Sequence, residues 1–384
     1  IALIGHSRGG EAAALAATFN SLSRYPNNAR VAWQFNFNIR AVAAIAPVDE
    51  QWQPADQPNP LENVSYLVLQ GSHDADLYFF DGIQQYNRTT FTDPQGDGFK
   101  AAVYIYRANH GQFNTTWGDR DSSGVKGQFL NRKALLPAQD QQQIAEVFIT
   151  AFLEVTLKGN QAYRSIFEDY RLAGDWLPQT NYITQYEDYG IRLVADFEED
   201  VDVLTCTLPG CVLRTSGLSR WNESAIRFRN RDRQENHVVR VGWSGLEGSY
   251  ALRFSLPQDW QPTPETLLVF KAADAREPED APEGLDFSMV LVDRWGNQAS
   301  IRLSDLLPLQ TQFPAEISRL AVWNESYYKE ASEEVFQTYR IPLNVFADVT
   351  PGLDLAGLKE IRFQFDQSPS GSVYLDEIGF DLVP

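Results

Sequence analysis

The hydrophobic pattern of the chain changes its period near residue 190, and this change limits the folds that are open to it. Before that point, continuous apolar runs at residues 1–4, 41–46, 66–70 and 101–106 are separated by stretches with helical spacing at residues 11–23 and 140–158. After it, apolar residues recur at every second position, at residues 251–256, 286–292, 298–303, 361–366 and 372–380. A chain of 384 residues has room for two differently built parts.

Each pattern predicts its own architecture. Continuous apolar strands separated by helices or long loops favour a parallel sheet that is covered on both faces, which is the α/β class. Short alternating strands bounded by Gly, Pro, Asn and Asp favour an all-β sandwich. We therefore expect an α/β part at residues 1–160, a Tyr/Asp-rich linker at residues 161–189, a β-sandwich at residues 190–384, and an exposed acidic loop at residues 272–284.

Charge and hydropathy exclude two kinds of partner. There are 32 basic and 51 acidic residues, a net charge of −19, so a large phosphate-neutralising surface is not expected and nucleic acid is not a partner. No run of about 18 apolar residues occurs, so no membrane span is expected. The chain begins at Ile1 and its one methionine is Met289, which predicts that the natural start, with any signal peptide, lies outside this sequence.

The two cysteines, Cys206 and Cys211, are separated by Thr-Leu-Pro-Gly, which suits a tight turn. They form either a disulfide or two free thiols, since no His or Cys lies at zinc spacing around them. A disulfide would indicate an oxidising compartment, and on this ground we expect a secreted or periplasmic protein.

Residues 5–10, Gly-His-Ser-Arg-Gly-Gly, stand between an apolar strand and an Ala-rich helix. That context is the one that a Gly-X-Ser-X-Gly nucleophile elbow requires, with the serine on a sharp strand-to-helix turn. Gly5 and Gly9 would lack a Cβ because strand and helix nearly touch there, and Ser7 would be the nucleophile. The helix N-terminus beside it favours an oxyanion.

A serine nucleophile needs a base, and the base needs an acid to orient it. His110 directly follows the strand at residues 101–106 and is the expected base, ahead of His73 and His237. Asp74, three residues after the glycine that ends the strand at residues 66–70, is the expected acid. Asp76 and Asp49 are the alternatives, and each of these acids could instead cap a helix.

The order Ser7, Asp74, His110 along successive strands resembles the α/β-hydrolase superfamily, near its dienelactone-hydrolase-like, chlorophyllase-like and polyester-hydrolase-like serine esterases. The resemblance covers about residues 1–160 and implies strands five to eight of that fold. It also implies that the Arg8 N–H is one oxyanion-hole donor, while its side chain forms a surface salt bridge or contacts substrate. The first four strands, the second donor and the lid would lie upstream, so this fragment alone is expected to be inactive and poorly soluble.

Further residues could shape the site. Phe113, Trp117 and Trp52 could line an acyl pocket or pack in the core or lid. Residues 119–124 resemble the first half of a calcium loop, but Leu130 stands at the twelfth position, where a bidentate Glu is expected, so we discount that loop.

The β half, from residues 196–198 to residues 374–380, resembles a galactose-binding-like jelly roll of the carbohydrate-binding-module kind. The resemblance implies a possible structural calcium ion at Glu198 and Asp376, which are otherwise solvated acids. Five tryptophans could stack on sugars or fill the core: Trp221, Trp243, Trp260, Trp295 and Trp323. Four alternating arginines at residues 227, 229, 231 and 233 would share one face of a strand, where they bind a polyanion or pair with acids.

The sequence thus predicts a serine hydrolase of carboxylic esters, small or polymeric, that needs no cofactor for catalysis. It carries an accessory β-sandwich that could bind polysaccharide. Two alternatives stay open: an Xaa-Pro peptidase or acylase, and a carbohydrate-binding or adhesion protein with a vestigial hydrolase half.

Overall fold

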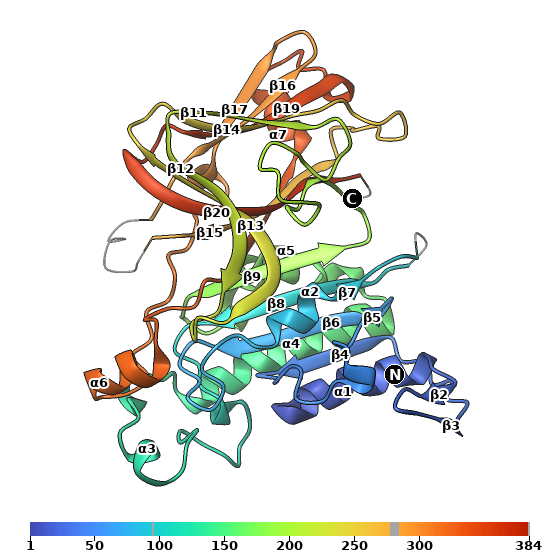
Figure 1. Ribbon diagram of the computed structural model, residues 1–384, viewed down its shortest axis with the longest axis vertical. Coiled ribbons are helices and arrows are strands. Elements are labelled where there is room, and N and C mark those ends of the chain that lie inside the picture. Colours follow the sequence, from blue (N-terminus) through green and yellow to red (C-terminus); the bar gives the residue numbers. More distant parts are fainter. Residues whose placement is uncertain (94–95, 277–283, 383–384) are drawn as a thin grey trace. The chain divides into compact units, whose positions relative to one another are not determined.

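The computed structural model describes residues 1–93, 96–276 and 284–382, and the chain divides into two compact units (Figure 1). The first unit contains Ile1–Tyr189, Arg227–Asp232 and Phe313–Glu333. The second contains Gly190–Ile226, Arg233–Gln312 and Glu334–Pro384. Two short segments from the second half of the sequence therefore fold with the first unit.

The first unit is built on one five-stranded sheet of order β1-β4-β6-β8-β9. Its strands are β1 (Ala2–His6), β4 (Ala41–Ile45), β6 (Ser65–Gly71), β8 (Phe99–Ile105) and β9 (Tyr182–Asp188). The first four are parallel, and β9 is antiparallel to β8. Two small ribbons accompany the sheet, one of β2 (Arg24–Tyr25) with β3 (Asn28–Ala32) and one of β5 (Leu61–Glu62) with β7 (Thr89–Thr90).

The helices of this unit are α1 (Arg8–Ser21), α2 (Ile83–Asn87), α3 (Gly124–Gln128), α4 (Ala138–Lys158), α5 (Ser165–Glu168) and α6 (Ala321–Trp323). Alternate residues of a strand point to opposite faces of the sheet, so the strands have two apolar faces. One face, with Ala43, Leu67 and Val103, forms a core with Ile144 and Phe148 of α4. The other face meets α1 and the connection after β6, because a Cβ added to Gly10 would lie 3.2 Å from the Ala44 Cβ and one added to Gly82 would lie 3.0 Å from Val68 Cγ2.

The described chain is mostly β-structure, and the expected α/β-hydrolase fold class is wrong. Among the described residues only α1 and α4 are longer than seven residues. In the described residues of the connections from β4 to β6 and from β6 to β8, no helix is longer than the five residues of α2. The physical reason lies in residues 47–64, where four prolines interrupt any helix, so the strands do not alternate with covering helices as that class requires.

The segment at residues 161–189 is not the expected linker. It contains α5 and then β9, whose seven residues pair with β8 from Phe99↔Asp188 to Ile105↔Tyr182. Three of the first five side chains of β9 are apolar or aromatic, and all five are buried. The aromatic residues that suggested a Tyr-rich connection are therefore core residues of the first unit.

The second unit is a sandwich of two antiparallel sheets, which confirms the predicted β-sandwich. One sheet has the order β12-β13-β20-β15-β18, with β10 also paired to β20, and the other has the order β11-β14-β19-β16-β17. The first sheet is formed by β10 (Ile191–Ala195), β12 (Leu218–Arg227), β13 (Arg233–Ser244), β15 (Leu267–Asp274), β18 (Gln337–Pro342) and β20 (Ser370–Asp381). The second is formed by β11 (Val212–Ser216), β14 (Gly248–Arg253), β16 (Ser288–Asp293), β17 (Gln298–Arg302) and β19 (Leu358–Phe365), and α7 (Leu343–Val349) follows β18.

The core of the sandwich comes from alternate residues of both sheets, among them Phe270, Phe363 and Trp243. Trp243 stacks on Phe365 with 4.1 Å between ring centroids, so this tryptophan is a core residue.

A disulfide joins Cys206 and Cys211, which confirms the bonded alternative for the Pro-Gly turn. Residues 277–283 of the expected acidic loop lie outside the described residues, whereas Ala272 is buried in β15.

The four alternating arginines do not share a strand face. β12 ends at Arg227 and β13 begins at Arg233, and Arg231 between them has a φ of 75°. Arg229 is 2% exposed, whereas Arg231 lies at the surface beside Glu330. A turn therefore separates side chains that a continuous strand would have aligned.

Within the described ranges, no helix is both long and apolar enough to cross a membrane.

Candidate functional site

The predicted elbow has the geometry that a nucleophilic serine needs. Ser7 stands between β1 and α1 with φ 56° and ψ −127°, a conformation that costs free energy for a residue with a side chain. Its N–H donates to the Ile45 carbonyl at 2.8 Å, and its own carbonyl accepts from the Gly10 N–H at 2.8 Å. These two bonds hold the strained turn in place.

The positions at the elbow that require glycine differ from those that the motif predicts. A Cβ on Gly5 would lie 1.8 Å from the Gly9 carbonyl oxygen, so strand and helix do touch at Gly5. A Cβ on Gly10 would lie 2.6 Å from the Pro47 Cβ, whereas one on Gly9 would meet nothing within 4 Å. The expectation that Gly9 must lack a side chain is wrong, and the constraint falls on Gly5 and Gly10.

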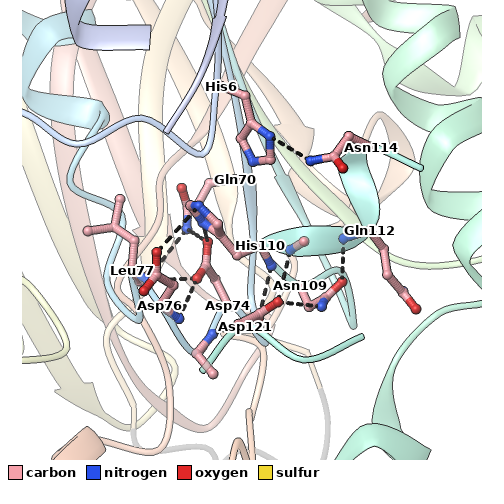
Figure 2. A network of polar contacts seen from close by, with 12 residues as sticks. His6, Gln70, Asp74, Asp76, Leu77, Asn109, His110, Gln112, Asn114 and Asp121 are labelled. Carbon is pink, nitrogen blue, oxygen red and sulfur yellow. Dashed lines mark hydrogen bonds and ion pairs between the residues drawn. The ribbon is translucent and has the colours of Figure 1, made fainter. Parts of the chain in front are cut away.

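The structure brings the predicted base and acid together. The Nδ1–H of His110 donates to Asp74 Oδ2 at 2.7 Å, and both side chains are buried (Figure 2). Asp74 follows β6 and His110 follows β8, and β6 and β8 are parallel neighbours. Ends of parallel strands meet at one edge of a sheet, which explains why residues 36 positions apart in sequence can pair.

Asp74 accepts hydrogen bonds on both carboxylate oxygens. Oδ1 accepts from the backbone N–H groups of Asp76 and Leu77, at 2.9 and 2.7 Å, and Oδ2 also accepts from Gln70 Nε2 at 3.2 Å. The carboxylate is therefore fixed by its own loop and by β6 before it meets His110 (Figure 2). Charge-assisted bonds of this kind orient the imidazole and set its tautomer.

The second nitrogen of His110, Nε2, is buried and has no hydrogen-bond partner among the described residues. Burial alone would lower the pKa of His110, but the Asp74 carboxylate, followed by Asp76 and Asp121, raises the pKa to about 9. His110 is therefore mostly protonated at neutral pH, and the fraction that can act as a general base grows as pH rises toward 9.

The competing candidates occupy other places. Asp49 forms a bidentate ion pair with Arg88, at 2.6 and 2.7 Å, and Asp76 Oδ2 lies 3.6 Å from His110 Nε2 without holding the ring. His73 is buried against Ser72, and burial, followed by Arg229 and Arg107, lowers the pKa of His73 to about 3. His237 pairs with Glu198 in the second unit.

Ser7 and His110 line one cleft of about 790 Å³, which falls in the size range of small-molecule sites. Trp117 lines it too and stacks parallel on His110, with 5.8 Å between ring centroids and an interplanar angle of 5°. His6 packs beside both rings, at 4.9 Å from His110 and 4.6 Å from Trp117. The other wall comes from residues 120–124 together with Gly127 and Gln128.

Of the three aromatic residues expected near the pocket, only Trp117 lines this cleft. Phe113 is 8% exposed and belongs to the core beneath the sheet, and Trp52 packs against Phe19 and Tyr25. Arg8 is the first residue of α1, where backbone N–H groups have no intrahelical acceptor, and its side chain is exposed. Its N–H is thus available to an oxyanion beside Ser7.

Sequence reasoning missed the residues that support the Asp74 loop from afar. Glu333 Oε2 accepts from the Phe80 N–H at 3.1 Å, and its Oε1 accepts from the Arg229 N–H at 3.0 Å. The Arg229 guanidinium donates to the carbonyls of Ala315 and Glu330, both at 2.6 Å. These segments are far apart in sequence, and no local pattern pointed to them.

The acids expected to bind calcium have protein partners. Glu198 Oε2 lies 3.0 Å from His237 Nδ1, and Asp376 Oδ2 accepts from Asn236 Nδ2 at 2.9 Å. Burial, and next the neighbouring Glu377, raises the pKa of Asp376. In the described ranges, no group of three or more His, Cys, Asp or Glu side chains is arranged to hold a metal ion.

No family model and no curated protein matches this chain. Among solved structures, the chain is similar to the family 30 carbohydrate-binding module of a cellulosomal cellulase of Clostridium thermocellum, with 12% identity over 44% of this chain and 88% of that one, and a TM-score of 0.29. It is similar to the family 11 module of another cellulosomal cellulase of that organism, with 14% identity over 51% and 97% and a TM-score of 0.30. An exo-β-agarase matches with 13% identity over 50% and 25% and a TM-score of 0.32.

These matches are carbohydrate-binding modules and an agarase, and none of the three is an α/β-hydrolase. Their TM-scores are too low to support any argument about a ligand. The description of the second unit as a sandwich therefore rests on its own strands. The α/β-hydrolase class expected from the elbow has no support among them, and the chemistry of the site therefore stands on its geometry alone.

The contacts at the elbow predict opposite outcomes for adjacent glycines. Gly9→Ala places its Cβ in open space at the start of α1 and should leave the free energy of unfolding within about 1 kcal/mol of native. Gly10→Ala drives its Cβ against Pro47 and should destabilise the fold by about 1–3 kcal/mol. Urea unfolding of the two variants checks this, and equal midpoints would contradict the assignment.

The charges around His110 predict the pH dependence of any reaction in which it is the base. Since the pKa is raised to about 9, the neutral form increases as pH rises, and kcat/KM should climb to a plateau above that value. Asp76→Asn removes one carboxylate and should move the rise of kcat/KM to lower pH. The shift should be less than about one pH unit, because Asp76 is exposed. Asp175→Asn, at an exposed position in the 3-10 segment Tyr170–Trp176, is the control and should leave the profile unchanged.

Proposed function

We propose that this protein is a serine hydrolase that cleaves carboxylic esters. One observation carries the proposal: a strained Ser7 and a buried His110 line the same cleft. The Nε2 of this histidine accepts no hydrogen bond from the described residues, while its Nδ1 is held by the buried Asp74. This is the arrangement of a nucleophile, a general base and an orienting acid, which recurs on unrelated folds.

In the proposed reaction, Ser7 Oγ attacks the ester carbonyl carbon while His110 Nε2 takes the hydroxyl proton. The Arg8 N–H donates to the oxyanion at the N-terminus of α1. His110 then protonates the leaving alcohol, which departs and leaves an acyl group on Ser7. Water enters, gives a proton to His110, attacks the acyl carbon and releases the acid, and Ser7 recovers its proton.

Two further features bear on where and how the protein acts. The Cys206–Cys211 disulfide supports an oxidising compartment, so we place the protein in a secreted or periplasmic setting. Catalysis needs only side chains and water, and no cofactor enters the proposed steps.

Covalent labelling tests the nucleophile. A fluorophosphonate probe should label the protein that carries this chain at Ser7, and Ser7→Ala should abolish labelling. His110→Ala should slow it by on the order of 10³-fold or more, because the base is lost. Thr116→Ala, a hydroxyl loss at an exposed position near the cleft, is the matched control and should label at the native rate.

Substrate choice separates the ester hydrolase from its nearest rival. p-Nitrophenyl acyl esters should be hydrolysed, and prolyl anilides should not. Preferential cleavage of the anilides would favour the Xaa-Pro peptidase or acylase alternative, and labelling that persists in Ser7→Ala would refute the mechanism altogether.

A second candidate function, polysaccharide binding by the sandwich, is favoured by one residue. Trp295 is 75% exposed at the turn between β16 and β17. The turn is held by Asp293, which accepts from the N–H groups of Trp295 and Asn297, both at 2.9 Å. A large apolar ring that is kept exposed on a fixed turn is suited to stack on a sugar face.

Affinity electrophoresis of the whole protein in gels containing β-glucan or agarose tests this second function. Native protein should be retarded, and Trp295→Ala should weaken binding by up to about tenfold, the value of one aromatic stacking contact. Trp176→Ala, a similarly exposed tryptophan of the first unit, should bind as the native protein does. Unretarded migration of the native protein in every polysaccharide would exclude the function.

A further inference from the structure

Asp121 is a half-buried carboxylate outside the proposed triad, and it lies between the two loops that carry the triad's acid and base. Its Oδ1 accepts from the Gly111 N–H at 2.9 Å and from Asn109 Nδ2 at 2.6 Å. Its Oδ2 accepts from the His110 N–H at 3.0 Å and from the Ala75 N–H at 3.0 Å. One side chain therefore bonds to residues on both sides of the Asp74–His110 pair (Figure 2).

We propose that Asp121 is a positioning residue that sets the distance and orientation between His110 and Asp74. The inference rests on the proposed hydrolase function and goes beyond it, since Asp121 touches neither Ser7 nor the nitrogen that takes the proton. It assigns a role to a residue that the sequence placed only in an incomplete calcium loop.

The hydrogen bonds support this role over a purely local one. The Ala75 N–H belongs to the loop after β6, next to Asp74, whereas the His110 and Gly111 N–H groups belong to the loop after β8. Each loop would keep its own fold through local bonds, such as those from Asp76 and Leu77 to Asp74. The two loops also meet where the His73 N–H donates to the Ala108 carbonyl at 2.9 Å. The Asp121 carboxylate adds a second link on the other side of the pair, from the Ala75 N–H to the N–H groups of His110 and Gly111, so it acts on the separation of the two loops there.

The ionised form of Asp121 lowers the stability of the folded protein, which is consistent with a functional role. Burial, and next the charge of Asp74, raises the pKa of Asp121 to about 6, although three backbone N–H groups oppose the shift. Because this pKa is higher in the folded state than in an unfolded chain, ionising Asp121 lowers the stability of the fold as pH rises through about 4 to 6. A charge that is retained at a cost to folding is typical of functional sites.

Several titratable groups lie around Asp121 and His110, and their titration also contributes to any pH dependence of the site. Asp74, Asp76 and Asp121 surround His110, and His6 packs against its ring. The Tyr328 phenol faces Asp121, whose charge is one cause of the raised pKa of that tyrosine, after burial and Tyr327.

The test compares Asp121→Asn with Asp119→Asn, an acid of the same loop that pairs with Arg132 at the surface. Asparagine keeps the shape of Asp121, but its amide nitrogen faces N–H donors and cannot accept from them. We expect kcat for p-nitrophenyl acetate to fall on the order of 10- to 100-fold, with KM within about twofold of native, because orientation and not binding is lost. The rising limb of the pH profile should also move to lower pH, since a carboxylate near His110 is gone. Asp119→Asn should behave as the native protein.

A spectroscopic readout does not depend on finding the right ester. The proton shared by His110 Nδ1 and Asp74 should give a low-field proton resonance in the native protein, and Asp121→Asn should shift or broaden it while Asp119→Asn leaves it in place. Should Asp121→Asn not fold, Asp121→Glu keeps the charge on a longer arm and should show an intermediate kcat with the same KM.

The outcomes are separable. A native protein that neither labels with fluorophosphonate nor hydrolyses esters, but shows the low-field resonance change in Asp121→Asn, would refute the hydrolase and leave the positioning role standing. A native kcat per labelled site, together with an unchanged resonance in Asp121→Asn, would overturn the positioning role.

Discussion

The contact between β1 and α1 at Gly5 is the constraint on which the rest of the site depends. With only 1.8 Å between a Cβ there and the Gly9 carbonyl, the chain must turn from strand to helix in a single residue. That residue is Ser7, and it takes up the turn in a conformation with positive φ. The strain is held by bonds to Ile45 and Gly10, so the hydroxyl is presented by the backbone and needs no side-chain support.

The proposed partners of Ser7 follow from strand order. β1, β4, β6 and β8 run parallel, so the residues after β6 and β8 emerge at the same edge as the elbow. This regularity is why Asp74 and His110 could be predicted from their positions after apolar runs. The strand positions themselves, and the disulfide at the Pro-Gly turn, depend on local sequence, and they too could be predicted.

What could not be predicted depends on contacts between distant segments. Asp121, Arg229 and Glu333 have no local pattern that separates them from solvated charges. Arg229 and Glu333 are buried, and Asp121 is half-buried, because of loops that pack only in the folded chain. The prediction of an α/β-hydrolase fold class is wrong for a related reason. The apolar runs correctly predict the strands, but the prolines between β4 and β6 prevent the helices that the strand pattern alone suggests. The four arginines were misjudged because a turn at Arg231 cannot be seen in an alternating pattern.

The two excursions at Arg227–Asp232 and Phe313–Glu333 have a consequence for how this protein can be divided. The chain passes between the two units five times, at residues 189/190, 226/227, 232/233, 312/313 and 333/334. A single cut near residue 190 would separate the Asp74 loop from Arg229 and Glu333, whose bonds support it. The residues of the first unit are thus not contiguous in sequence, and a fragment that ends near residue 190 would lack two of the segments that complete this unit.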